Sequence, residues 1–282
     1  MIDATTLELT GALPRPEVNF TANHERELPL TKEEQEQCIA RALQAGRQHK
    51  YQMAYTRWYS AKMMGPTFPI QLNAEQYLIL FRRRADELAR QEGRKEFVID
   101  AHNEGPIWLL CLYFARDERF ETEFGYNLKK NLMLRGNVGC GKSTILSMFC
   151  SNHFQSFTLV PCRDVSDSFE EKGKPLLKHY YGTLTSADVA QTWGHKDIGI
   201  AFDDLGTENF QAQFMGNYSN PMAEVLSQRY DKAHTLPAGA THLTTNLMHD
   251  EIDSIYHGRV GSRIRDMFND IIFDSGSPDR RG

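Results

Sequence analysis

The chain has 282 residues, of which 40% are hydrophobic and 24% charged, so it can bury a full core and is expected to hold one large domain and a small one. Its formal net charge of −5 excludes the global positive field of a strongly basic nucleic-acid-binding protein, although a local basic patch stays possible. The five scattered cysteines include no CxxC pair, and neither a signal peptide nor an apolar run of membrane-spanning length is present, so we expect a cytoplasmic protein without a zinc site, a disulfide framework or a membrane partner.

The N-terminal part of the sequence predicts a flexible arm and a long helix. Residues 1–23 are polar and contain two prolines, which is typical of a flexible segment. The sequence TKEE at 31–34 is a capping box, in which the Thr31 side chain caps the helix and the glutamate three residues on reaches back. We therefore expect a helix that runs to about Met63, where the sequence GPTFP ends it.

A second capping sequence, NAEQ at 73–76, predicts another helix, which ends near Gly93. These two helices lead us to expect a helical N-terminal region at 24–100 that binds a partner. The large domain is then expected at 101–282.

Aromatic and basic side chains alternate within the first predicted helix. Such interleaving binds single-stranded nucleic acid by stacking and charge, although similar stripes also form core or partner-docking surfaces. Both interpretations stay open for the residues concerned, which are Arg47, Lys50, Tyr51, Tyr55, Arg57, Trp58, Tyr59 and Lys62.

Strands and helices alternate through the rest of the chain, which predicts an α/β fold with a parallel sheet and helices on both faces. In such a fold, binding sites form at the carboxyl ends of the strands. Strands are predicted at 128–136, 156–162, 195–206, 240–247 and within 265–276, and helices at 104–120, 143–154, 163–173 and 220–233, while 174–193 has no clear pattern.

The sequence GNVGCGKS at 136–143 fits the phosphate-loop pattern G-x-x-x-x-G-K-[ST] at every fixed position. Its glycines let the backbone turn tightly, so that successive N–H groups can cradle a phosphate. Lys142 supplies a charge for the β- and γ-phosphates, and the Ser143 hydroxyl can ligate Mg²⁺. We therefore expect ATP and Mg²⁺ to bind through the loop residues Gly136, Asn137, Val138, Gly139, Cys140, Gly141, Lys142, Ser143 and Thr144.

The predicted strand at 195–206 ends in two aspartates and resembles a Walker B segment. Asp203 would then hold Mg²⁺, and Asp204 would lie within reach of the attacking water. Two adjacent carboxylates can also simply cap a strand end. Many ATPases with a Walker B segment carry Asp-Glu at these two positions. The Asp204 side chain is shorter than that of a glutamate, so we predict slow hydrolysis. Glu208 is the second candidate for positioning water.

Four motifs in a fixed order resemble the DnaC/IstB-type branch of the AAA+ ATPases: GNVGCGKST, IAFDDLGTE, HLTTNL and YHGRVGSRIRDMF, within about residues 104–274. This branch includes bacterial and phage helicase loaders and the ATPase subunits of some insertion elements. The resemblance implies an AAA+ P-loop NTPase fold with a parallel sheet flanked by helices, preceded by a small helical N-terminal region. Only SGSPDRRG follows the last predicted strand, so no C-terminal lid is expected.

The resemblance also implies roles for three residues outside the loop. Asn246 matches the sensor 1 position, whose polar side chain helps to hold the attacking water. Arg263 matches the arginine finger, which enters the site of a neighbouring subunit, and Arg259 is the second candidate. Hydrolysis would then be slow and would depend on a nucleotide-dependent homo-oligomer. Alternatively, both arginines are surface or salt-bridge residues. The absence of a lid also removes the usual location of the sensor 2 arginine, and Arg280 or Arg281 could reach the nucleotide from the tail in its place.

Three functions stay open at this point. The first is an ATP-switched loader that binds single-stranded DNA and a replicative helicase and acts in DNA replication. The second is an IstB-like ATPase that assembles on duplex DNA and recruits a transposase. The third is a nucleotide-dependent regulatory switch with a protein partner and no DNA.

Overall fold

The computed structural model describes residues 29–63, 71–93, 96–185, 193, 195 and 197–280, without the side chains of 57–63. The arm expected at 1–23 and the predicted helix break at 65–69 lie outside the described residues. The chain divides into two units, Met1–Met63 and Met64–Gly282. No helix in the described ranges is both long and apolar enough to cross a membrane.

The first unit contains one long helix, α1 (Lys32–Met63), which begins at the predicted capping box. The Thr31 N–H donates to the Glu34 carboxylate at 2.8 Å, and the Glu34 N–H donates to the Thr31 hydroxyl at 3.3 Å. Every side chain described in this helix is exposed. The rings of Tyr51 and Tyr55 stack with their centroids 6.5 Å apart. Helix α1 therefore carries exposed aromatic side chains.

Helix α2 (Ala74–Gln91) begins at the second predicted capping box, formed by Asn73 and Gln76. Its buried residues recur at three- and four-residue intervals, so they form a single stripe along the helix. This stripe packs against α3 (Glu104–Ala115) in the second unit. The sequence placed α2 in the N-terminal region 24–100, whereas the structure groups it with the large unit. The buried residues of the stripe are Ala74, Tyr77, Phe81, Ala85 and Ala89.

The second unit is built on a sheet with the strand order β2-β4-β7-β1-β8, and all neighbouring pairs along this path are parallel. The short strand β3 pairs with β4 in the antiparallel sense. Because β7 lies between β1 and β4, the phosphate-loop strand, the TTNL strand and the aspartate strand end at the same edge. The strands are β1 (Asn131–Arg135), β2 (Phe157–Pro161), β3 (Leu184–Thr185), β4 (Asp197–Leu205), β7 (Thr241–Thr245) and β8 (Phe268–Ile272).

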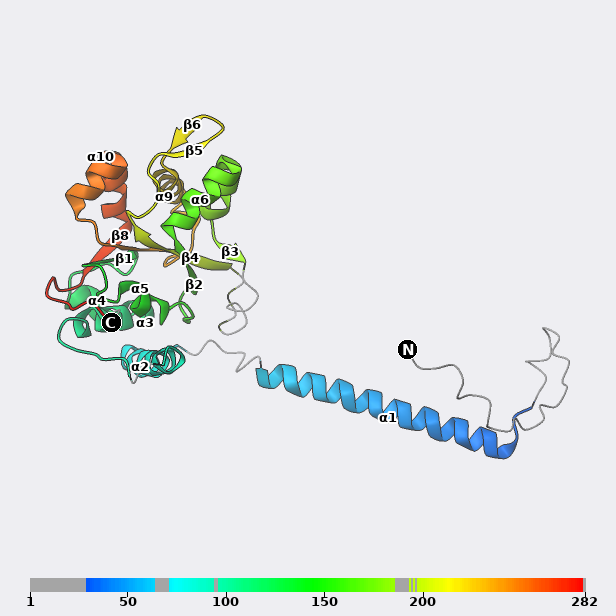
Figure 1. The fold of residues 1–282 in the computed structure, drawn as a ribbon. Helices are drawn as coiled ribbons and strands as arrows, with labels where there is room; N and C mark the ends of the chain where they lie inside the picture. The colour runs from blue at the N-terminus through cyan, green and yellow to red at the C-terminus, as the bar shows by residue number, and fades with distance from the viewer. Residues whose placement is uncertain are drawn as a thin grey trace, which may run out of the picture. The chain divides into compact units, whose positions relative to one another are not determined.

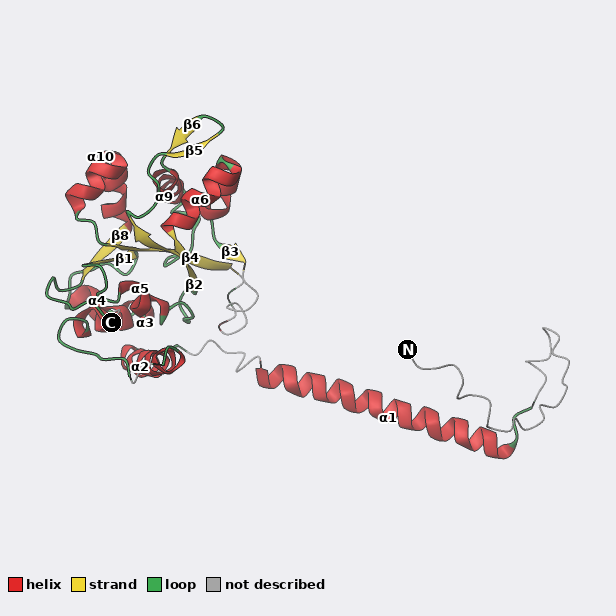
Figure 2. Ribbon diagram, in the orientation of Figure 1, coloured by secondary structure: helices red, strands yellow, loops and turns green. Residues whose placement is uncertain are grey.

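Helices cover both faces of this sheet, so the expected α/β fold is confirmed (Figures 1 and 2). One hydrophobic core contains side chains of α2, α3 and α5, and the other contains side chains of α6, α9 and α10. Burying both faces explains why the strands read as nearly continuous apolar runs. The remaining helices are α4 (Arg119–Thr122), α5 (Lys142–Ser147), α6 (Cys162–Lys172), α7 (Lys174–Leu177), α9 (Pro221–Asp231), α10 (His249–Met267) and the 3₁₀ helix η2 (Lys178–Tyr181).

Two helices are shorter than predicted. The helix expected at 143–154 is α5, which ends at Ser147. Just beyond it, the buried Asn152 amide donates to two backbone carbonyls and accepts from two backbone N–H groups, which fixes a turn in place of further helix. The helix expected at 104–120 divides into α3 and α4, because Arg116 adopts the left-handed conformation with φ of 58°.

The structure also contains a hairpin that the sequence did not predict, formed by β5 (Ala212–Phe214) and β6 (Asn217–Ser219). Its turn residues Met215 and Gly216 have φ of 47° and 81°. Glycine adopts such φ values without strain, but methionine seldom does. The pair Met-Gly is therefore not one of the usual hairpin-turn sequences, and the sequence did not indicate this turn.

Candidate nucleotide-binding site

The phosphate loop joins β1 to α5 and takes its shape from its glycines. Gly139 and Gly141 have φ of 82° and 95°, values that side chains with a Cβ seldom adopt. A Cβ added at Gly139 would overlap the carboxylate of Asp279, so this glycine also allows a close approach of another segment. The predicted order of strand, loop and helix is confirmed.

Lys142 is the first residue of α5 and is only 5% exposed. Its ammonium donates to the carbonyl oxygens of Gly136 at 2.9 Å and Asn137 at 3.0 Å. A buried ammonium needs such acceptors, because burial without them is costly. The loop therefore holds a positive charge at a fixed place beside its own backbone.

The two aspartates at the end of β4 differ in conformation. The pairing of β4 with β7 shifts register between Phe202 and Leu205, and Asp204 within this irregularity has φ of 55°. Thr244 of β7 connects both residues. Its hydroxyl donates to the Asp203 carboxylate at 2.6 Å and accepts the Asp204 N–H at 2.8 Å. The sequence reading did not single out Thr244, although it is the first polar residue of the TTNL motif.

A cavity of about 460 Å³ opens beside the phosphate loop. One wall consists of loop residues and Asp204, and the facing wall comes mainly from α2 and the segment 96–98. The second wall carries five apolar residues and two acidic ones, Glu92 and Glu96, so it is apolar apart from two carboxyl groups. The lining residues are Ala85, Leu88, Ala89, Glu92, Glu96, Phe97, Val98, Gly139, Gly141, Lys142, Ser143, Thr144, Asp204 and Arg280.

Of the residues predicted outside the loop, Asp204 and Arg280 line this cavity. Asn246 is exposed directly after β7, at the same edge of the sheet. Its neighbour Thr245 is buried and donates through its hydroxyl to the Leu205 carbonyl at 2.7 Å, which ties the end of β7 to the end of β4.

Glu208 is buried, and both of its carboxylate oxygens accept hydrogen bonds. The Gly206 N–H donates to one oxygen at 2.8 Å, and the Tyr256 hydroxyl donates to the other. Burial raises the pKa of this carboxyl, partly offset by the hydrogen bonds. The side chain therefore connects the loop after β4 to α10, close to the kink at His257, where φ is 64°.

The two candidate arginines lie beyond this kink in α10. Arg263 pairs with Asp231 of α9 at 3.0 Å and lies over the Tyr230 ring, with its guanidinium carbon 4.9 Å from the ring centroid. It also reaches the Ser227 carbonyl at 3.5 Å. Arg259 is exposed on the same helix. The structure thus holds Arg263 against α9 and places it on the face of the sheet opposite to α5.

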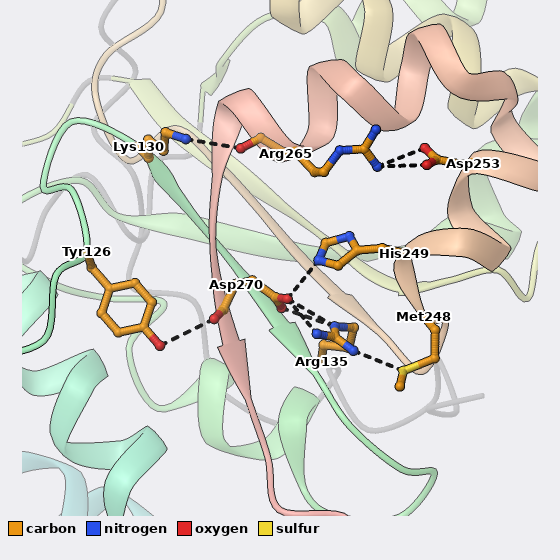
Figure 3. Close-up of polar contacts among 8 residues, drawn as sticks. All are labelled: Tyr126, Lys130, Arg135, Met248, His249, Asp253, Arg265 and Asp270. Carbon is orange, nitrogen blue, oxygen red and sulfur yellow. Dashed lines mark hydrogen bonds and ion pairs between the residues drawn. The ribbon is translucent and has the colours of Figure 1, made fainter.

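Figure 3 shows a polar network at the root of the phosphate loop. Arg135, the residue before Gly136, donates to both carboxylate oxygens of Asp270 on β8, with a shortest distance of 2.7 Å. The same guanidinium reaches the Met248 sulfur at 2.9 Å, and the His249 ring lies 3.0 Å from the Asp270 carboxylate. The network joins β1, β8 and the start of α10, so it fixes the strand end from which the loop departs.

The expected metal ligands are oxygen atoms at the same edge of the sheet. No group of three His, Cys, Asp or Glu side chains suited to a metal occurs among the described residues. Mg²⁺ bound with a nucleotide does not require one, because phosphates and waters supply most of its ligands. The Ser143 hydroxyl and the Asp203 carboxylate are hard oxygen donors, so they fit this ion.

No protein-family model matches the chain, and no curated protein matches its sequence. Among solved structures, it is similar to the DnaC helicase loader, with 15% identity and a TM-score of 0.40 over 63% of this chain and 93% of that chain. It is also similar to closed-state Hsp104 with ATPγS and FITC casein, with 14% identity and a TM-score of 0.34 over 71% of this chain and 36% of that one. By its phosphate loop, its parallel sheet flanked by helices and the order of its motifs, the chain is an α/β P-loop NTPase that resembles the DnaC-type AAA+ ATPases.

Proposed function

We propose that the protein binds Mg-ATP and hydrolyses it. The observation that carries this proposal is the single cavity that joins Lys142, Ser143 and Asp204 to an apolar wall. Its volume of about 460 Å³ lies in the usual range for small-molecule sites. The apolar wall suits a purine base, and the loop end suits the phosphates.

Each residue of the polar end has a distinct role in this proposal. Lys142 neutralises charge on the β- and γ-phosphates, and the loop backbone cradles them. Ser143 and Asp203 would hold the magnesium ion, which when bound neutralises charge that develops on the phosphates. Asp204 orients the attacking water and accepts its proton. Thr244 fixes the Asp203 carboxylate and the Asp204 backbone, and in this proposal the first aspartate serves the metal and the second the water.

Changing Lys142 to Ala is expected to weaken ATP binding by about 10- to 100-fold, because the phosphates lose a charged hydrogen-bond donor. The measurement is calorimetric titration of ATP in the presence of Mg²⁺. Lys129→Ala serves as the matched control, since Lys129 is an exposed lysine ahead of β1. Equal ATP affinity in the Lys142→Ala variant and the wild type would contradict the assignment of the cavity.

We propose further that this ATPase is a DnaC-like helicase loader, which acts in DNA replication by changing its DNA and helicase binding with nucleotide state. The resemblance of the four motifs to the DnaC/IstB-type branch supports this role. The exposed aromatic surface of α1, with its stacked Tyr51 and Tyr55, offers single-stranded DNA a place to stack.

The double change Tyr51→Ala and Tyr55→Ala is expected to weaken binding to single-stranded DNA by about 5- to 100-fold, because base stacking is lost. Ile39→Ala is the matched control, since Ile39 is an exposed apolar residue of the same helix. Binding to single- and double-stranded DNA is measured at about 50 and 200 mM salt.

Other outcomes separate the alternative functions. Unchanged affinity in the double variant would remove α1 as the DNA site. A preference for duplex DNA, with capture of a transposase in place of a helicase, would favour the IstB-like role. An absence of DNA binding at every salt concentration would favour a regulatory switch.

A further inference from the structure

The segment Asp274–Arg280, called the strap below, follows β8 and lies across the phosphate loop. The Asn137 side chain donates to the Ser275 carbonyl at 2.8 Å. Farther along the strap, the Arg280 N–H donates to the Gly139 carbonyl at 3.0 Å. Figure 1 shows the red end of the chain passing from β8 toward the face covered by α3 and α5.

The strap is also fixed to the segment that precedes α3. The His102 ring lies 2.6 Å from the Asp274 carboxylate, at the start of the strap. At its other end, Nη2 of Arg280 donates to both carboxylate oxygens of Asp100, at 2.8 and 2.7 Å. Asp100 follows the cavity wall at 96–98 by two residues. The strap thus connects the loop to the apolar side of the cavity.

Arg280 is the strap residue that lines the cavity together with Lys142 and Ser143. The aliphatic part of its side chain lies over the loop, because a Cβ added at Gly141 would be 3.6 Å from the Arg280 Cδ. Its side chain is 18% exposed, and that of Asp100 is 31% exposed. A guanidinium that is paired with Asp100 therefore lies at the edge of the cavity beside the phosphate loop.

We infer that Arg280 is a nucleotide-binding residue, which exchanges the Asp100 carboxylate for a phosphate oxygen of the bound nucleotide. This inference rests on the proposed binding of ATP. A polyphosphate carries several negative charges, and attraction is stronger in a partly desolvated cavity than in water, so the phosphates compete well with the Asp100 carboxylate. Asp100 acts as a positioning residue, which keeps the guanidinium at the cavity until nucleotide arrives.

This role and a purely structural one predict opposite effects of removing Asp100. If the pair only fastens the strap, removal of either partner loosens the loop and weakens binding to the same extent. If Arg280 contacts phosphate, loss of Asp100 removes a competitor. Neutral substitution of Asp100 then leaves ATP affinity unchanged or raises it.

The experiment titrates wild-type, Arg280→Ala and Asp100→Asn proteins with ATP, ADP and AMP in the presence of Mg²⁺. Arg280→Ala is expected to weaken ATP binding by about 10-fold or more, and Asp100→Asn is expected not to weaken it. The three nucleotides identify the phosphate concerned, since the effect disappears once that phosphate is missing. Thermal unfolding of each variant checks that the fold is retained.

A second ion pair provides the matched control. Arg265 donates through one nitrogen to both oxygens of Asp253, at 2.8 and 3.0 Å, on helix α10 away from the cavity. Arg265→Ala and Asp253→Asn are expected to bind ATP like the wild type. Equal affinity of Arg280→Ala and wild type would overturn the inference, and so would equal weakening by Arg280→Ala and Asp100→Asn.

Failure of the underlying function is distinguishable from failure of the inference. If the wild-type protein binds no ATP, both the proposed function and the role of Arg280 are wrong. If the wild type binds ATP and Lys142→Ala weakens it, but Arg280→Ala does not, the site is correct and the strap inference alone is wrong.

Discussion

Replacement of Asp204 by Asn is expected to lower ATP turnover by about 100- to 10,000-fold, because an amide cannot take a proton from the attacking water. ATP binding is expected to change little, since Lys142 and the loop backbone are retained. The reason for choosing this carboxylate is its position. Asp204 lines the cavity with Lys142 and Ser143, while the Asp203 carboxylate is engaged by Thr244.

Glu208→Gln is the matched control for this change. Both oxygens of Glu208 are engaged away from the cavity, by the Gly206 N–H and the Tyr256 hydroxyl. A glutamine can accept from Gly206 through its oxygen and donate to the Tyr256 oxygen through its nitrogen, so the local structure survives. We expect this variant to retain wild-type turnover.

The control variant also has an expected pH dependence. Because burial raises the pKa of Glu208 in the folded protein, its ionisation destabilises the fold as pH rises through that folded pKa. Glu208→Gln removes the buried charge, so its thermal stability at neutral pH should equal or exceed that of the wild type.

Single-turnover hydrolysis and thermal unfolding are measured on both variants. A loss of turnover in Glu208→Gln as large as in Asp204→Asn would show that Glu208 enters the cavity and positions the water itself. Full activity of Asp204→Asn would remove Asp204 as the proton acceptor. Either result would contradict the present assignment.

Local sequence patterns predicted the parts of this fold that depend on neighbouring residues. The capping boxes at Thr31 and Asn73 gave the starts of two helices, and the phosphate loop lies between a strand and a helix as expected. These features follow from backbone hydrogen bonds over three or four residues, which a sequence displays directly.

The features that escaped prediction depend on residues that are distant in sequence. Thr244 bridges the aspartates from 41 and 40 positions away, and Glu208 is satisfied by Tyr256, which is 48 residues farther along the chain. The bond of Arg280 to Asp100 spans 180 residues. Neither spacing nor composition contains such pairings, because they arise only when the sheet brings strand ends together.

Helix α2 shows the same limit at the level of domains. The sequence predicted this helix from its capping sequence NAEQ, and the structure shows a stripe of small and aromatic residues buried along it. A capping sequence does not reveal what that stripe packs against. The structure shows that α2 packs on α3 and lines the cavity, so part of the expected N-terminal region contributes to the proposed nucleotide site.

Arg263→Ala is expected to lower ATP turnover per subunit by about 1,000-fold or more if this arginine completes the site of a neighbouring subunit. A guanidinium delivered in this way neutralises charge that develops on the transferring phosphate. In the structure Arg263 lies on the opposite face from α5, held by Asp231 of its own chain. We propose that it acts on another subunit and not on its own nucleotide.

A structural role of Arg263 is tested by a second arginine of the same helix. Arg265→Ala removes an ion pair to Asp253 without touching the proposed finger, although the Arg265 side chain is 43% exposed and that of Arg263 only 17%. Partly exposed ion pairs contribute about 0–1 kcal/mol to stability, so both variants should fold. If Arg265→Ala loses as much turnover as Arg263→Ala, the loss comes from a changed position of α10 and not from the missing charge of Arg263. Arg259→Ala tests the second candidate in the same assay.

The decisive measurement mixes Arg263→Ala protein with Lys142→Ala protein. The first variant has an intact nucleotide site and no finger, and the second has a finger and a damaged site. Mixed assemblies contain interfaces in which both parts are intact, so the mixture should recover turnover that neither variant has alone. The wild-type rate per subunit should also rise with protein concentration, because assembly completes the site. A wild-type rate independent of concentration, together with an inactive mixture, would show that Arg263 serves only its own subunit and that hydrolysis does not require assembly.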